Sequence, residues 1–208
     1  MGSVGLLYVG AILFLNGVML LGWVDGKSAA PLNLFVGLLQ VVTPTYLIFT
    51  AGGDQNAILG ASGLYLFGFT YLYVAMNLFF DLDGTGLGYF SGFVAGCAIV
   101  FAGLNFFREG FGDNGFGVIW LHWAFLWALF FVVLGLRMEN LGRYTGGVCA
   151  IQGIVTGAIP AFLLLTDNWG DNIDAAAIAL AVGGVVVFGA LWPVLRESSP
   201  ASSAAAVT

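Results

Sequence analysis

Apolar residues fill most of this chain, in long runs separated by short polar breaks. Seven runs reach the length of about 20 residues that a helix needs to cross a hydrocarbon core about 30 Å thick. The breaks hold nearly all the charges and many glycines. The pattern predicts transmembrane helices over residues 3–23, 31–51, 56–80, 87–107, 115–136, 145–166 and 175–195.

These runs predict an all-α integral membrane protein, a bundle of seven transmembrane helices. A membrane β-barrel would instead show stretches of about ten residues that alternate apolar and polar side chains. Because the breaks are short, no room remains for a soluble domain. We expect one transmembrane domain over residues 1–196 and a disordered, Ser/Ala-rich cytoplasmic tail over residues 197–208.

Composition agrees with a lipid environment and excludes several partners. Of the 208 residues, 60% are hydrophobic and 8% are charged, whereas a soluble domain has about 25% charged residues. A net charge of −6 with only five basic residues argues against nucleic acid as a partner. One histidine and two separated cysteines suggest neither a metal site nor a disulfide framework, and no cofactor is expected.

The positive charges predict how the chain is oriented in the membrane. Lys27, Arg137, Arg143 and Arg196 fall on one side, and Arg108 alone falls on the other. The side richer in Lys and Arg is normally cytoplasmic, so the N-terminus is expected outside and the C-terminus inside. The outer loops then carry Asp54, Glu109, Asp113, Asp167, Asp171 and Asp174.

The predicted helices contain no Lys, Arg, Asp or Glu. Ion-coupled carriers and voltage sensors keep ionisable residues within the membrane, and a retinal protein needs a Lys in a helix. The sequence therefore argues against all three classes. The sequence also shows no nucleophile paired with a base and no carboxylate pair in the membrane, so an enzyme is not expected.

Neutral polar groups lie among aromatic residues at helical spacing. Such stripes either fill a bundle core, with the amides bonding across helices, or line a path through it. The stripe of the first run is Leu6, Val9, Leu13 and Asn16, and that of the third run is Phe69, Tyr73 and Asn77. The stripe of the fifth run is Phe116, Trp120, Trp123 and Trp127, and the sixth run contains Gln152.

Two further features each allow two interpretations. His122 lies about 100° round the helix from Trp123, off the aromatic stripe, and is either a protonation switch or a neutral residue bonded to a neighbouring helix. The Gly92-x-x-x-Gly96 and Gly153-x-x-x-Gly157 pairs favour close helix packing, either within the bundle or between protomers.

Four stretches resemble the AmiS/UreI family, which includes short-chain amide transporters and an acid-gated urea channel, and the amide-transporter branch is the more similar. The resemblance covers the first six helices and leaves the seventh as a C-terminal addition. The stretches are GLLYVGAILFLNG at Gly5 to Gly17, LYLFGFTYLYVAMN at Leu64 to Asn77, VIWLHWAFLW at Val118 to Trp127 and AIQGIVTGAIPAFLL at Ala150 to Leu164.

The resemblance implies a passive channel for urea or small aliphatic amides in a bacterial cytoplasmic membrane. It also implies a homohexamer in which each protomer has its own pore. A non-transporting membrane subunit of a larger complex remains the alternative interpretation of a helical bundle without membrane charges. The positions that match the pore lining of the urea channel are Leu6, Val9, Leu13, Phe69, Tyr73, Trp120, Trp123, Leu126 and Trp127.

The sequence departs from the urea channel at two places. Where that channel has a glutamate, this chain has Gln152, a difference that bears on selectivity. The His-rich outer loop that confers acid gating is replaced by the short segment from Gly52 to Gln55, which contains no histidine. Acid gating by that mechanism is therefore not expected.

Overall fold

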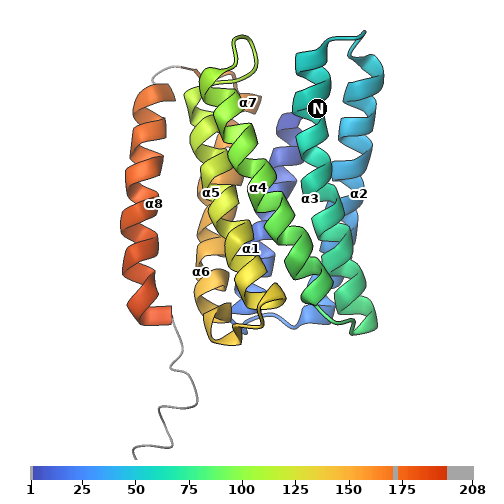
Figure 1. The fold of residues 1–208 in the computed structure, drawn as a ribbon, viewed down its shortest axis with the longest axis vertical. Coiled ribbons are helices and arrows are strands. Elements are labelled where there is room, and N and C mark those ends of the chain that lie inside the picture. Colours follow the sequence, from blue (N-terminus) through green and yellow to red (C-terminus); the bar gives the residue numbers. More distant parts are fainter. Residues whose placement is uncertain (1, 171–172, 196–208) are drawn as a thin grey trace, which may run out of the picture.

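The computed structural model describes residues 2–170 and 173–195, and every regular element in these ranges is helical (Figure 1). Seven helical segments have the length and apolar composition to cross a membrane, which confirms the predicted all-α bundle. The elements are α1 Gly2–Leu20, α2 Gly26–Thr50, α3 Gln55–Phe80, α4 Thr85–Phe107, α5 Asn114–Phe130, η1 Phe131–Gly135, η2 Glu139–Leu141, α6 Gly142–Gln152, η3 Gly153–Ala158, α7 Ile159–Leu165 and α8 Ile173–Leu195.

Two of these elements interrupt longer helices with a π-helical turn. η1 extends α5, and η3 joins α6 to α7, so that seven membrane-crossing segments comprise more than seven elements. The predicted tail, Arg196 and Asp171 lie outside the described residues.

The bundle has two ends, which we name from Figure 1. The upper end carries the loops 51–54 and 108–113, and the lower end carries the loops 21–25 and 81–84. Aspartates begin several helices by accepting hydrogen bonds from backbone N–H groups of the first turn, as Asp25, Asp54 and Asp113 do for α2, α3 and α5. Such caps satisfy donors that the helix itself leaves free.

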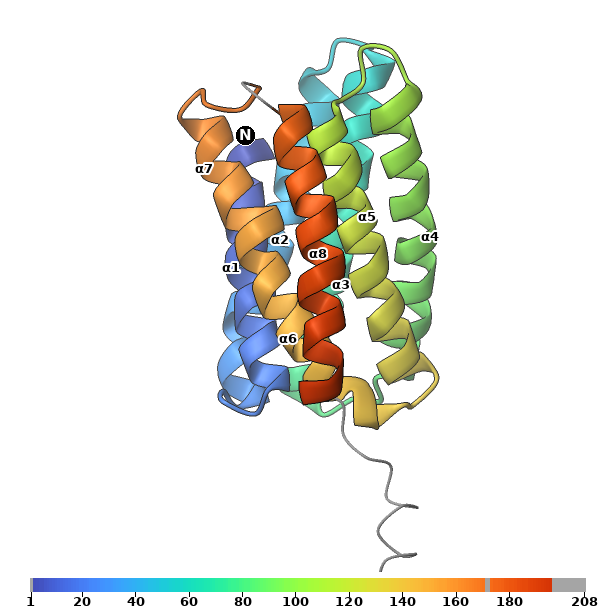
Figure 2. The ribbon, with the colours of Figure 1, turned by 90° about the vertical axis from the view of Figure 1, so that its left-hand side faces the viewer.

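The helices pack as neighbours in sequence, with α2 against α3 and α4 against α5, while α1 packs along α6 and its continuation. α8 lies outside this group and contacts α5 and α6 (Figures 1 and 2). Only Ala177 and Phe188 of α8 are buried. The last helix is therefore an addition to the surface of a six-segment core.

The crossing of α1 over η3 depends on glycine. A Cβ atom at Gly10 would lie 2.6 Å from the backbone oxygen of Gly153, and one at Gly157 would lie 2.5 Å from the Cα atom of Gly10. Any side chain at these positions would force the helices apart. The Gly153-x-x-x-Gly157 pair thus serves packing within the chain. Gly92 likewise faces Phe131, whereas Gly96 faces open space.

Candidate functional site

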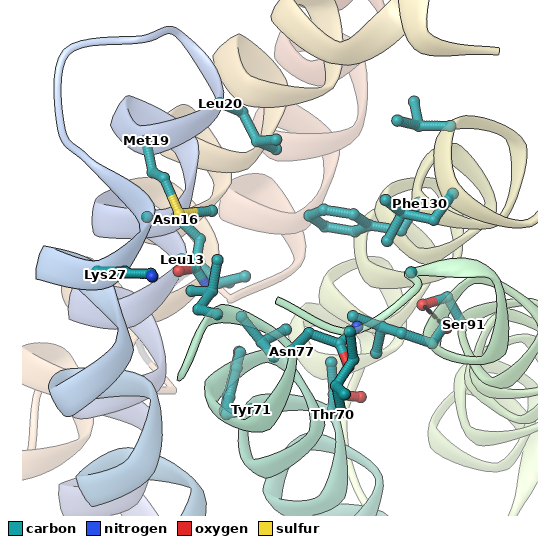
Figure 3. Close-up of a pocket in the computed structure, with 18 of the residues that line it drawn as sticks. Leu13, Asn16, Met19, Leu20, Lys27, Thr70, Tyr71, Asn77, Ser91 and Phe130 are labelled. Atoms are coloured by element: carbon teal, nitrogen blue, oxygen red, sulfur yellow. Dashed lines mark hydrogen bonds between the residues drawn. The ribbon is translucent and has the colours of Figure 1, made fainter. Parts of the chain in front are cut away.

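Two cavities follow one another along the axis of the bundle, each bordered by α1, α3 and α5. The upper cavity has a volume of about 310 Å³, and the lower cavity has a volume of about 640 Å³ (Figure 3). Stepping down α1, Leu6 and Val9 border the upper cavity, and Leu13 and Asn16 border the lower cavity. A spacing of three or four residues keeps them on one face of the helix.

A layer of aromatic rings separates the cavities. The Phe67 ring meets the rings of Trp123 and Trp127 edge to face, with centroids 4.7 Å and 4.9 Å apart. Phe67 and Trp123 border the upper cavity, and Trp127 borders the lower cavity. All three are nearly completely buried. We call Phe67, Trp123 and Trp127 the aromatic layer.

Both indole N–H groups of the aromatic layer are bound by threonines. Trp123 Nε1 donates to Thr156 Oγ1 over 3.0 Å, and that hydroxyl donates to the backbone oxygen of Gln152. Trp127 Nε1 donates to Thr70 Oγ1 over 3.3 Å, and that hydroxyl donates to the backbone oxygen of Leu66. The polar atoms of the rings are therefore satisfied within the protein, and apolar ring surfaces are left to face a solute.

The wall of the lower cavity is more polar than the aromatic layer. Asn16 and Asn33 exchange two hydrogen bonds of 2.8–2.9 Å through their amides. Tyr71 and Asn77 of α3 border the same cavity (Figure 3), and Tyr71 Oη and Asn77 Oδ1 are buried without a hydrogen-bond partner among the described residues. A solute in this cavity therefore finds uncharged hydrogen-bonding groups.

Ion pairs lie at the lower end of the bundle. Lys27, which borders the lower cavity, pairs with Asp81 over 3.1 Å, and Arg137 pairs with Asp83 over 3.1 Å. Hydrogen bonds from Thr85, together with the nearby Arg137 guanidinium, hold the pKa of Asp83 below its ordinary value. These pairs are exposed, so the charge lies at the mouth of the lower cavity and not within the aromatic layer.

Most of the residues predicted from the stripes are brought together by the structure. Leu126 is fully buried in the hydrophobic core and borders neither cavity. The predicted residues that border the upper cavity are Leu6, Val9, Phe116, Trp120 and Trp123, and those that border the lower cavity are Leu13, Asn16, Asn77 and Trp127.

On α3 a different face borders the cavities from the one expected. Phe69 is 50% exposed and stacks on Tyr65, away from both cavities. The Tyr73 hydroxyl lies against Gly86 of α4, and this residue borders neither cavity. The residues that take their places are Phe67 and Tyr71.

Packing against α2 sets this rotation of α3. A Cβ atom at Gly68 would lie 2.9 Å from the backbone oxygen of Gln40, so the Gly68 side of α3 is pressed against α2. Phe67 and Phe69 lie about 100° to either side of Gly68, and only Phe67 faces the interior. Because Gly68 lies midway between Phe67 and Phe69, the sequence alone does not show which of the two rings faces inward.

The other polar candidates lie away from the cavities. Gln152 is fully buried, and its Nε2 donates to the backbone oxygen of His122 over 2.9 Å. His122 Nδ1 lies 3.0 Å from the backbone oxygen of Val118 in its own helix, and its ring meets Phe188 of α8 edge to face. His122 therefore belongs to the contact between α5 and α8, where Gly184 leaves room for its ring.

Comparison with known proteins gives one consistent family. The profile of the AmiS/UreI family transporter matches residues 1–168. The chain is 56% identical over 177 residues to a proposed transporter protein, AmiS2, of Rhodococcus erythropolis, with 85% of each chain covered. It is 51% identical over 187 residues to a proposed amidate substrates transporter protein of Mycolicibacterium smegmatis, covering 90% of this chain and 87% of the relative.

A solved structure agrees with the sequence relatives. The Helicobacter pylori urea channel in its closed state superposes with a TM-score of 0.73 at 35% identity. The match covers 81% of this chain and 100% of the urea channel chain. The family match ends before α8, which begins at Ile173. The seven apolar segments and these relatives identify a multi-pass membrane protein, and this chain belongs to the AmiS/UreI family.

Proposed function

We propose that this protein is a passive channel for small neutral amides, namely urea, acetamide and similar short-chain aliphatic amides. One observation carries the proposal: two cavities lie end to end along α1, α3 and α5, and the aromatic layer lies between them. The relatives named as amide transporters and urea channels support the same solute class.

The physical task of such a channel is to lower the cost of dehydrating a polar solute. Moving an amide from water into hydrocarbon without partners costs about 4–8 kcal/mol, and each 1.4 kcal/mol is about tenfold in partitioning. Water and polar wall groups in the cavities reduce this cost, because they form hydrogen bonds with the solute until it reaches the aromatic layer. A flat solute then passes between ring faces, while ions are excluded because their dehydration costs far more.

The proposal includes an orientation and an assembly. Lys27, Arg137 and Arg143 gather at the lower end and Arg108 lies at the upper end, which supports a cytoplasmic lower end. The protein would then sit in the cytoplasmic membrane of a bacterium, as a homohexamer with one path per protomer, and would deliver amides to a cytoplasmic amidase or urease. Catalysis by the channel itself forms no part of the proposal.

The competing function is a non-transporting membrane subunit of a larger complex. A structural subunit needs no interior space, and its aromatic stripes would fill a close-packed core. Two cavities along one axis favour the channel instead.

The test is solute flux into proteoliposomes, followed by light scattering after a step in acetamide, urea or a larger polyol. The expected result is swelling with acetamide and urea that is clearly faster than in empty liposomes, and no difference with the polyol. Amide flux equal to that of empty liposomes would refute the channel.

A further inference from the structure

The upper cavity is bordered by a buried amide whose hydrogen bonding is incomplete. Gln40 of α2 is 1% exposed, and its Nε2 donates to the backbone oxygen of Gly5 over 2.7 Å. Because a carbonyl oxygen only accepts hydrogen bonds, this contact fixes which end of the side chain carries the NH₂ group. Oε1 is left buried and without a partner among the described residues.

The rest of the upper cavity offers few alternatives for a polar solute. Its wall is mostly aliphatic and aromatic, and the second side-chain amide, Asn105 of α4, also turns its NH₂ group to a backbone oxygen, that of Phe101, over 2.8 Å. In each amide the protein occupies one of the two N–H groups, whereas Gln40 Oε1 has no partner among the described residues. The unpartnered oxygen favours solutes that donate N–H hydrogen bonds.

We propose that Gln40 Oε1 is a solute-binding point of the upper cavity, which accepts a hydrogen bond from an N–H group of urea or a primary amide. This inference rests on the proposed channel function. A solute that leaves bulk water loses partners for its N–H groups, and a buried acceptor without a partner is itself unfavourable. One hydrogen bond satisfies both groups just above the aromatic layer, while the single contact is weak enough to allow release.

The chain contains a matched control for this residue. Gln152 is also fully buried, its Nε2 also donates to a backbone oxygen, and its Oε1 also lacks a partner among the described residues. The difference is that Gln152 borders neither cavity. Replacing either glutamine with Met removes an amide of the same size and burial, but only Gln40→Met removes an acceptor from the proposed path.

The experiment compares urea flux through the wild-type protein, Gln40→Met and Gln152→Met in proteoliposomes with equal protein content. Loss of one hydrogen bond corresponds to a decrease of roughly two- to tenfold, expected for Gln40→Met, while Gln152→Met stays within about twofold of the wild type. Equal decreases in both variants, or no decrease in Gln40→Met, would overturn the binding point. Wild-type flux at the level of empty liposomes would instead refute the channel.

A competition measurement tests the N–H requirement without depending on a variant that folds. Acetamide or N,N-dimethylacetamide is added at equal concentration on both sides of the membrane, and the flux of labelled urea is followed. In the wild type, acetamide should inhibit at a lower concentration than its dimethylated form, which lacks N–H groups. In Gln40→Met the ratio of the two inhibitory concentrations should shrink. Equal inhibition in the wild type would contradict the proposal.

Discussion

The upper and lower cavities meet at the same aromatic layer but differ in volume and in the hydrogen-bonding groups of their walls. The upper cavity is about half the volume of the lower, about 310 Å³ against about 640 Å³, and Gln40 Oε1 is its buried acceptor without a partner. The lower cavity has Tyr71, Asn77 and the Asn16 amide in its wall and charges at its mouth. The difference indicates that a solute is dehydrated in the upper cavity and regains partners in the lower cavity.

Opening the aromatic layer should have the largest effect, because it joins the two cavities. In Trp123→Ala the flux of butyramide relative to acetamide is expected to rise about tenfold, equivalent to roughly 1.4 kcal/mol of barrier. Because Trp123 is 4% exposed, the same change should lower the free energy of unfolding by about 3–5 kcal/mol. Flux of the two amides by light scattering and thermal unfolding in detergent check both expectations.

The control for Trp123→Ala is His122→Ala, one residue earlier on α5. His122 faces α8 and borders neither cavity of the path, so its removal should leave the ratio of the two amide fluxes unchanged. The same change of ratio in both variants would show that the aromatic layer does not set solute size.

Removing the hydroxyl of Thr156 or of Thr70 should have an intermediate effect on stability. The loss should be larger at the site that water does not reach than at the site beside the lower cavity. Thr156 is fully buried and borders neither cavity. Thr156→Val therefore leaves the Trp123 N–H without its partner at a place that water does not reach, which is expected to cost about 1–3 kcal/mol of unfolding free energy. Thr70→Val frees the Trp127 N–H beside the lower cavity, where water can replace the hydroxyl, so the loss should be smaller. Thermal unfolding of both variants measures the difference.

Serine at either threonine position keeps the hydroxyl and supplies the matched control. Thr156→Ser should restore most of the stability and the wild-type ratio of butyramide to acetamide flux. If Thr156→Val and Thr156→Ser lose the same stability, the methyl group is responsible and the bond to Trp123 contributes little.

The smallest effect is expected at the charged mouth of the lower cavity. Lys27 pairs with Asp81 in an exposed position, and such pairs contribute about 0–1 kcal/mol. Lys27→Met should therefore change urea flux by less than about twofold, since a neutral solute has no net interaction with the pair. A wild-type flux that falls steeply between low and high salt would indicate a charged solute instead.

The sequence predicted the seven membrane-crossing segments because each is a run of apolar residues bounded by charges, and lipid imposes that length directly. The stripes on α1 and α5 were also readable, since Leu6 to Asn16 and Phe116 to Trp127 recur at helical spacing. On α1 one face alone combines aliphatic groups with an amide, and on α5 one face alone carries four large aromatic rings.

The face of α3 could not be predicted in the same way. The stretch Phe67 to Tyr73 reads FGFTYLY, which contains two Phe-x-x-x-Tyr pairs offset by two residues. Asn77 lies about 80° round the helix from both Phe67 and Phe69, but about 40° from Tyr73 and about 120° from Tyr71. Helical spacing therefore favours the Phe69 and Tyr73 pair, which borders neither cavity. The choice depends on the close contact of Gly68 with the Gln40 backbone, which is a property of the packed helices.

The threonine hydroxyls that bind Trp123 and Trp127 also bear on whether the channel conducts protons. Each indole N–H donates to a threonine, and each threonine donates to a backbone oxygen, so the aromatic layer has no free donor to anchor a file of water molecules. Protons hop along such files but not across ring faces. A neutral solute could then cross continuously while the proton gradient over the membrane stays intact.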